Sequence, residues 1–259
     1  MQKALLEIDH VSRSYAVPGK KEKVTVFQDV CLKIHKGEFV TVVGHSGCGK
    51  STLLNIIAGI DRAEEGMVLV NGRRIDSPGL DRMVVFQNFA LMPWLTVYQN
   101  IRLAVQAAYP DWEQQKIDER TRAYVEMVNL KGAEDKLPAA LSGGMRQRCG
   151  LARAFSVQPP IMLLDEPFAQ IDALTRGVIQ DELIRMWTES DVTIFMVTHD
   201  VDEAILLSDR ILLMTPGPGA RVAETVAIEI PRPRERKRII EHERYYSYRN
   251  RIIKFLAGE

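Results

Sequence analysis

A glycine-rich stretch of eight residues constrains the fold of this 259-residue chain more than any other feature. It runs from Gly44 to Ser51 with the spacing G-x-x-x-x-G-K-S, after the β-branched segment 39–43 and before the apolar segment 52–58. A strand, a glycine loop and a helix in this order predict a P-loop, where backbone N–H groups and the helix N-terminus hold phosphate. The alternative is an ordinary glycine-rich turn. We expect a nucleoside triphosphate held by Gly44, His45, Ser46, Gly47, Cys48, Gly49, Lys50, Ser51 and Thr52, with Lys50 on the β- and γ-phosphates and Ser51 on Mg²⁺.

A pair of carboxylates follows a second apolar segment. Residues 161–164 are short enough for a buried strand of a parallel sheet, and Asp165 and Glu166 come directly after it. Ligands of α/β proteins bind at this carboxyl end of the strands. We therefore expect Asp165 to hold Mg²⁺ and Glu166 to act as the general base on an attacking water. Without the P-loop, the pair would be read only as the polar end of a strand.

Charge and cysteine content limit the kinds of partner. The chain has 34 basic and 34 acidic residues, so no overall field attracts nucleic acid. Its three cysteines, Cys31, Cys48 and Cys149, are odd in number and lack C-x-x-C spacing, which favours reduced thiols. The apolar segment 83–97 is too short and too interrupted to cross a bilayer. We expect the chain to act at a membrane only through a partner.

The pattern of apolar residues predicts an α/β protein with a helical insertion. Helical periodicity begins at Val97, and we expect Asp111 to cap the second helix of this region. Apolar strands at 161–164 and 193–197 alternate with helices, which indicates a mainly parallel sheet covered on both faces. The expected parts are an N-terminal portion of the α/β core with a β subdomain (1–89), a helical subdomain (90–156), the rest of the core (157–230) and a basic helical tail (231–259).

A third polar stretch, Leu141 to Arg148, reads Leu-Ser-Gly-Gly-Met-Arg-Gln-Arg. A serine and two glycines that open a helix can bind a phosphate group, although they also suit an ordinary capped helix start. One chain does not need two sites for the same terminal phosphate. Two chains that face each other head to tail do need both, because each chain can complete the pocket of the other. The stretch therefore favours a dimer.

Together these motifs resemble those of the ATP-binding subunits of ABC transporters, over nearly the whole chain. The pattern L-S-G-G-x-x-Q-R at Leu141–Arg148 is more specific for that family than the P-loop is. The resemblance implies an α/β fold: a P-loop NTPase (RecA-like) core with an antiparallel β subdomain and a mostly helical ABC insert. It also implies roles for further residues: Ser142, Gly143 and Gly144 at the γ-phosphate of ATP on the opposite subunit, Asp172 in the interface loop, Tyr15 on adenine, Gln87 at Mg²⁺ and the attacking water, and His199 at the γ-phosphate.

One loop departs from the family pattern. Importers of this kind carry G-A-L-D-A-L-T-R after the catalytic carboxylate region, whereas residues 169–176 read Ala-Gln-Ile-Asp-Ala-Leu-Thr-Arg. Gln170 is polar and bulkier than the usual small residue, and this loop crosses the dimer interface in the family. The departure leaves a heterodimer open beside a homodimer. It also motivates a non-hydrolysing regulatory partner as an alternative, although the catalytic motifs are intact.

Weaker similarities indicate the kind of transporter. The segments 77–82 and 91–97 look like those of nitrate, sulfonate, taurine or bicarbonate importers. The P-loop residues His45 and Cys48, and the sequence Arg-Pro-Arg at 232–234, resemble the nitrate/cyanate/bicarbonate branch most. That branch often pairs a short ATPase, which this chain resembles, with a longer one. A sulfonate or taurine importer remains the alternative.

The resemblance implies an ATPase that energises an inward ABC transporter for nitrate or a related small anion, with ATP and Mg²⁺ as cofactors. The implied partners are transmembrane permease subunits, a second ATPase subunit and, through the permease, an extracytoplasmic solute-binding protein; nucleic acid is not among them. The implied location is the cytoplasmic face of the inner membrane, as a peripheral subunit. The alternative from another class is a soluble ABC ATPase that acts on ribosomes or DNA. Such proteins usually carry two cassettes or a long coiled-coil insert, and this sequence shows one cassette and no heptad array.

Three local features add expectations. The segment 91–97, if exposed, would suit docking of a permease helix, and otherwise would pack under the helical insertion. The tail 232–251 carries eight basic residues and three glutamates, so it is either a solvated helix face or a contact for anionic lipid. Cys48 lies beside a helix N-terminus and Lys50, which predicts a lowered thiol pKa, inactivation by maleimide and protection by MgATP.

Overall fold

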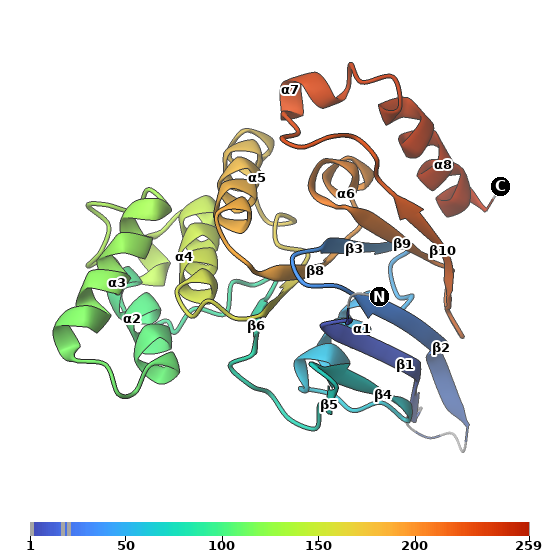
Figure 1. The fold of residues 1–259 in the computed structure, drawn as a ribbon, viewed down its shortest axis with the longest axis horizontal. Helices are drawn as coiled ribbons and strands as arrows, with labels where there is room; N and C mark the ends of the chain where they lie inside the picture. The colour runs from blue at the N-terminus through green and yellow to red at the C-terminus, as the bar shows by residue number, and fades with distance from the viewer. Residues whose placement is uncertain (1–2, 17–18, 20–21, 259) are drawn as a thin grey trace. The chain divides into compact units, whose positions relative to one another are not determined.

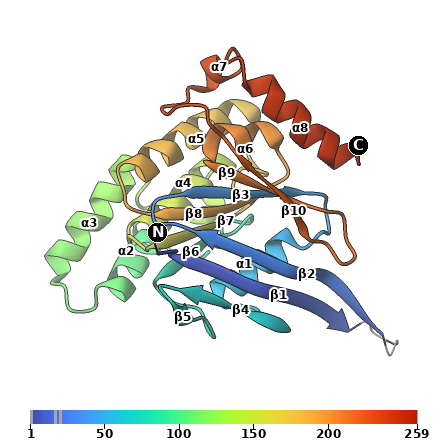
Figure 2. The ribbon, with the colours of Figure 1, turned by 45° about the vertical axis from the view of Figure 1, so that its right-hand side comes forward.

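The computed structural model describes residues 3–16, 19 and 22–258 and divides into two compact units. Residues 1–79 and 193–259 make the first unit, and residues 80–192 make the second. Figures 1 and 2 show the helices and strands along the chain. The first unit contains β1 (Leu6–Ala16), β2 (Lys23–Ile34), β3 (Phe39–Gly44), α1 (Lys50–Ala58), β4 (Glu65–Val70), β5 (Arg73–Arg74), β8 (Thr193–Thr198), α6 (Val201–Leu207), β9 (Arg210–Met214), β10 (Val222–Ala227), α7 (Arg236–Ile239) and α8 (Tyr245–Ala257).

An antiparallel sheet in the order β2-β1-β4-β5 occupies one part of the first unit. Leu6, Ile8 and Val11 are buried while their neighbours are more exposed, as expected for strands with one covered face. The pairing of β1 with β2 shifts register three times between Ile8 and Ser14. Each shift marks a bulge or irregularity, and such places turn side chains away from the regular pleat.

A second sheet of this unit contains the strand before the P-loop. Strand β3 lies between β8 and β9 and runs parallel to both, and β10 pairs antiparallel with β9. Every residue of β3 and β8 is buried, which explains why both read as continuous apolar runs. Each large apolar side chain buried in this way contributes about 1.5–3 kcal/mol to folding. The C-cap residue Gly59 ends α1 in the left-handed conformation, with φ of 75°.

The charges of the C-terminal segment are mostly satisfied within the chain. Four arginines make ion pairs with carboxylates of the same unit: Arg232 with Asp209, Arg244 with Glu229, Arg249 with Asp202, and Arg251 with Glu224. Arg234 is 6% exposed, and burial lowers its pKa to about 10. Its guanidinium donates to the carbonyl oxygens of Ile205, Leu206, Ser208, Ile228 and Ile230. The tail is therefore a docked structural element, which weakens the lipid-binding interpretation.

The second unit is built around α4. It contains β6 (Arg82–Val85), α2 (Val97–Ala108), α3 (Gln114–Met127), a 3₁₀ turn (Pro138–Ala140), α4 (Gly143–Phe155), β7 (Ile161–Asp165) and α5 (Ala173–Thr188). Helix α4 packs against α2, α3, α5 and β6. Its small residues, such as Gly150, Ala152 and Ala154, are buried and allow its neighbours to approach closely. Strand β6 runs parallel to β7, with Val85 opposite Leu164.

The expectation that Asp111 caps the second helix of the insertion is wrong. Helix α3 begins at Gln114, its N-cap residue is Glu113, and no side-chain cap bond forms there. The Trp112 N–H donates to the carbonyl oxygen of Tyr109, and the two rings stack with centroids 3.9 Å apart. This aromatic pair keeps residues 109–112 in a turn, so the helix starts later than the apolar pattern indicates.

Alternating strands and helices give the α/β class that the sequence predicts. Within the described residues, the structure contains no helix with the length and apolar character needed to cross a bilayer.

Candidate functional site

The P-loop connects β3 to α1 in the first unit. Gly49 adopts φ of 98°, and a Cβ there would lie 2.6 Å from Cγ1 of Val26 and 2.7 Å from the Phe27 ring. Only glycine fits such a position, because an L-residue would be strained and would also clash. His45, Ser46 and Gly47 are exposed at the tip of the loop. The loop is therefore a tightly constrained backbone turn whose tip faces outward.

Lys50 is the buried cation of this loop. The residue is 6% exposed, and its Nζ donates to the carbonyl oxygens of Gly44 at 2.8 Å and His45 at 3.0 Å. A cation held by neutral carbonyls keeps its full charge available for an anion in the loop. The His45 ring points elsewhere, since its Nε2 lies 2.6 Å from the carbonyl oxygen of Leu256 in α8. Ser51 and Thr52 belong to the first turn of α1, at the end of the helix where the dipole favours negative charge.

His199 lies at the same edge of the sheet as the P-loop. Val43 of β3 pairs with Thr198 of the parallel strand β8, so Gly44 and His199 are the next residues of neighbouring strands. Neighbouring strands are about 4.8 Å apart, which brings the start of the loop and this exposed histidine close together. The Thr198 hydroxyl donates to Glu203 and accepts from the Asp200 N–H, which fixes the backbone on both sides of His199.

Tyr15 lies near the end of β1 and is 42% exposed. Its hydroxyl donates to Asp61 at 2.5 Å, and the Arg13 guanidinium lies 4.4 Å from the ring centroid. Burial would raise the pKa of Asp61, but hydrogen bonds from Tyr15 and the Arg62 N–H, together with the Arg13 charge, hold that pKa below its usual value. The ring is thus held in one orientation, as stacking on a base requires.

In the second unit, Glu166 and Gln87 lie together. Asp165 ends β7 and Gln87 follows β6, which is parallel to it, so both segments leave the same sheet edge. The Gln87 Nε2 is 3.5 Å from the Glu166 Oε2. Glu166 adopts φ of 45°, a left-handed conformation that is rare for glutamate. Such strain persists only where the surrounding structure enforces it, and it is concentrated at functional sites.

The residues of the third polar stretch open α4. The Ser142 hydroxyl accepts from the Met145 N–H at 3.2 Å, and the serine itself is exposed. A Cβ on Gly144 would lie 2.4 Å from Cγ2 of Thr175, so glycine allows α4 to approach α5. A Cβ on Gly143 would lie 3.2 Å from the backbone oxygen of Gln170. The loop 169–172 therefore borders this stretch through its backbone, and the Gln170 residue is exposed.

Asp172 caps α5 in the same unit. Its carboxylate accepts from the Thr175 N–H at 3.0 Å. That backbone hydrogen bond, with one from the Thr175 hydroxyl, lowers the pKa of Asp172. The residue is exposed, so its negative charge faces outward at a helix N-terminus.

The expectation of a lowered thiol pKa at Cys48 is wrong. The Cys48 side chain is fully buried, and burial raises the pKa of its thiol despite the opposing effect of Lys50. The sequence places Cys48 beside a cation and a helix N-terminus, but it does not show that the thiol points into the core. A Cβ on Gly44 would lie 2.9 Å from the Cys48 Sγ, which shows how closely the loop covers this sulfur.

We expect maleimide at pH 8 to label Cys31 and to leave Cys48 and Cys149 unmodified in the folded chain. Cys31 is exposed, whereas the other two thiols are buried and burial raises the pKa of Cys149 to about 12. Only the thiolate reacts, so both access and ionisation oppose labelling in the interior. Mass spectrometry of the labelled peptides measures this, with the urea-unfolded chain as the control in which all three react. Labelling of Cys48 as fast as Cys31, suppressed by MgATP, would contradict the burial of Cys48 in the folded chain.

Comparison with known proteins assigns these motifs to one protein family. A family model described as "ABC transporter" matches residues 27–169, a range that begins in β2 and ends after Glu166. It includes the P-loop, Gln87, the Leu141–Arg148 stretch and the carboxylate pair. The chain belongs to the ABC transporter family. The predicted family resemblance is confirmed.

Individual relatives of this ABC protein show its branch. The nitrate import ATP-binding protein NrtC of Synechococcus elongatus is 48% identical over 98% of this chain, which spans only 38% of that relative. The bicarbonate transport ATP-binding protein CmpD of the same species is 46% identical over 97% of this chain and 90% of its own length. A solved dimer of the ATP-binding cassette MJ0796, described as a post-hydrolysis state bound to ADP and Pi, has a TM-score of 0.77 at 30% identity over 87% of this chain and 100% of that one. The predicted P-loop NTPase fold is confirmed.

Two residues of the ABC chain that sequence reasoning missed anchor the segment after Gln87. The Arg153 guanidinium donates to the backbone oxygens of Phe89 at 3.2 Å and Ala90 at 2.7 Å, and both acceptor residues have positive φ. Buried Asn100 donates to the carbonyl oxygens of Met92, Leu95 and Thr96. An arginine and an asparagine at helical positions carry no local signal for these roles, because their partners are identified only by tertiary structure.

Proposed function

We propose that the chain is the ATP-hydrolysing subunit of an ABC importer for nitrate or a related small anion such as nitrite, cyanate or bicarbonate. The observation that carries the hydrolytic part is the strained Glu166, with φ of 45° and the Gln87 amide 3.5 Å from its carboxylate. The names of NrtC and CmpD support the importer part, because those relatives are a nitrate import protein and a bicarbonate transport protein.

Glu166 is the proposed general base. Its carboxylate accepts the proton of the attacking water, and the strained backbone fixes the direction in which it accepts. Gln87 orients that water through its amide. His199, at the edge where the P-loop begins, donates to the oxygen of the transferred phosphoryl group. Lys50 neutralises charge on the β- and γ-phosphates, and Tyr15 stacks on the adenine.

The residues present fit a bound nucleotide and Mg²⁺. The P-loop offers a buried cation and a backbone turn that only glycine can make at Gly49. The proposed Mg²⁺ ligands Ser51, Gln87 and Asp165 can each offer a side-chain oxygen atom, which is the donor type that Mg²⁺ prefers. When bound, Mg²⁺ neutralises charge that develops on the phosphate oxygens.

One proposed direct partner is a second ATPase subunit. Ser142, Gly143 and Gly144, with Asp172 beside them, would complete the ATP site of that subunit. Gln170 is exposed, and its backbone oxygen borders the Ser142 loop, so both a homodimer and a heterodimer stay open. A heterodimer, including one with a non-hydrolysing partner, remains the alternative.

Transmembrane permease subunits are the other direct partner that we propose, through the segment 91–97. Trp94 is 71% exposed, while Val97 at the end of the segment is fully buried. The Asn100 side chain exchanges two hydrogen bonds with the backbone of Met92, which holds this segment in place next to exposed Trp94. A rigid turn with an exposed indole suits a protein partner. The chain would thus lie at the cytoplasmic face of the inner membrane, and the solute-binding protein would contact the permease.

The solute can be tested with the chain assembled into proteoliposomes with the permease and solute-binding protein with which it co-purifies. We expect nitrate or bicarbonate to stimulate ATP hydrolysis several-fold, because the loaded binding protein favours the closed ATPase dimer. Taurine and an alkyl sulfonate serve as the matched comparison. Stimulation by the sulfonates alone would favour the alternative branch, and co-purification with nucleic acid instead of a permease would contradict an importer.

A further inference from the structure

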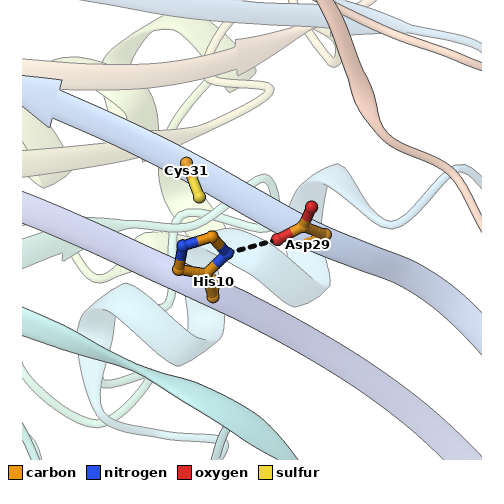
Figure 3. Close-up of side chains that lie close together, drawn as sticks. All are labelled: His10, Asp29 and Cys31. Carbon is orange, nitrogen blue, oxygen red and sulfur yellow. Dashed lines mark hydrogen bonds and ion pairs between the residues drawn. The ribbon is translucent and has the colours of Figure 1, made fainter.

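A cluster of three different side chains lies on the β1–β2 ladder, apart from the motifs described above. His10, Asp29 and Cys31 each offer one ligand atom, and these atoms all lie within 4.8 Å of one another (Figure 3). The His10 Nδ1 is 2.5 Å from the Asp29 Oδ1. All three residues are exposed, so the cluster is open to solvent.

Irregular pairing of the two strands brings these side chains together. Ile8 pairs with Leu32 and Val11 with Val30, so two residues of β1, including His10, oppose Cys31 alone. Two residues of one strand opposite a single residue of its neighbour form a β-bulge, which turns the side chain of the extra residue away from its regular direction. His10 has φ of 51° and Asp29 has φ of 54°. Both residues hold a conformation that glycine adopts without strain, yet each carries a side chain that points into the cluster.

The donor chemistry defines the ion that would fit. A thiolate, an imidazole and a carboxylate together form a mixed sulfur, nitrogen and oxygen set, which suits Zn²⁺ and similar ions and not Mg²⁺ or Ca²⁺. Ligand atoms around a tetrahedral Zn²⁺ are roughly 3.3–3.8 Å apart, so small side-chain rotations would bring the present atoms to that spacing. Three protein ligands leave a fourth position for water.

The surroundings of the cluster also favour a cation. The Asp9 carboxylate lies 3.9 Å from the His10 Nε2. A hollow of about 380 Å³ on the same ladder is lined by Asp9, Glu7 and Cys31, with Lys33 as its basic residue. Cys31 thus belongs both to this hollow and to the cluster. We propose that His10, Asp29 and Cys31 bind a divalent zinc-class metal ion at a surface site separate from the ATPase motifs.

Cobalt is the spectroscopic probe for the test. The full chain without affinity-tag histidines, reduced and free of nucleotide, is titrated with Co²⁺ and then with Zn²⁺. We expect one equivalent of Co²⁺ with a thiolate charge-transfer absorption, displaced by Zn²⁺ and not by Mg²⁺. His10→Asn, Asp29→Asn and Cys31→Ser should each weaken binding tenfold or more, whereas the control His242→Asn should not. Absence of the thiolate absorption, or unchanged affinity in His10→Asn, would overturn the proposal.

A second measurement avoids dependence on the variants. Asparagine tolerates the left-handed conformation at positions 10 and 29, so those two variants are expected to fold. In the unaltered chain, Zn²⁺ should slow maleimide labelling of Cys31 at least tenfold, and Mg²⁺ at the same concentration should have no effect. Equal labelling rates with and without Zn²⁺ would also overturn the proposal.

Discussion

Glu166→Gln is expected to lower kcat for ATP hydrolysis by a factor of about 10²–10⁴ while ATP affinity stays within a few-fold of the original. The range is that measured for the loss of a positioned general base, because glutamine cannot accept the proton of the attacking water. The substitution is nearly isosteric, so it should retain the strained backbone at φ of 45° and the neighbouring Gln87. Phosphate release and equilibrium binding of a fluorescent ATP analogue provide the two measurements.

The matched control for this prediction is Glu126→Gln, which makes the same chemical change in the same unit. Glu126 is exposed, and its carboxylate lies 3.5 Å from exposed Lys131, an ion pair of little energetic value. The kcat of the Glu126→Gln variant should equal that of the unaltered chain. If Glu166→Gln keeps its kcat, Glu166 is not the base. If it loses ATP binding as well, the residue supports the site structurally and the assignment as base is also wrong.

The parts of the site that were predictable from sequence are those set by short-range geometry. Glycine spacing, the first residues of α1 and the Ser142 cap all depend on residues within one loop or turn. The carboxylate pair Asp165 and Glu166 was also predictable, because it directly follows an apolar strand. A polar residue in that position marks the edge of a sheet. Sequence patterns of this length specify local structure directly.

The features that were missed depend on contacts between distant segments. We expect Cys48 to be unreactive because its side chain is buried in the core, and no neighbouring residue encodes that direction. Arg153 binds the backbone of Phe89 and Ala90 from more than sixty positions away. The arginines of the tail find carboxylates on elements of the first unit, so a count of basic residues overstated the charge available to a lipid surface.

Ser142→Asp tests whether two chains share each ATP site. Aspartate is as good an N-cap as serine, so α4 should keep its cap and the chain its stability. The added carboxylate would face the γ-phosphate bound to the opposite chain, and like charges at close range repel. We expect ATP binding by the monomer to be unchanged and ATP-dependent dimerisation to weaken tenfold or more. Ser142→Asn, which caps without a charge, is the matched control.

A mixture of two defective chains separates a shared site from a self-contained one. Lys50→Ala removes the cation of the P-loop, and Ser142→Asp alters only the surface offered to the partner chain. In a mixed dimer with Glu166→Gln in both chains, one site carries both defects and the other site carries neither. We therefore expect tagged mixed dimers to retain one ATP after rapid desalting, whereas dimers of either chain alone retain none. Mixed dimers that retain no ATP would contradict the shared site, because a shared site requires only that intact Lys50 and intact Ser142 come from different chains.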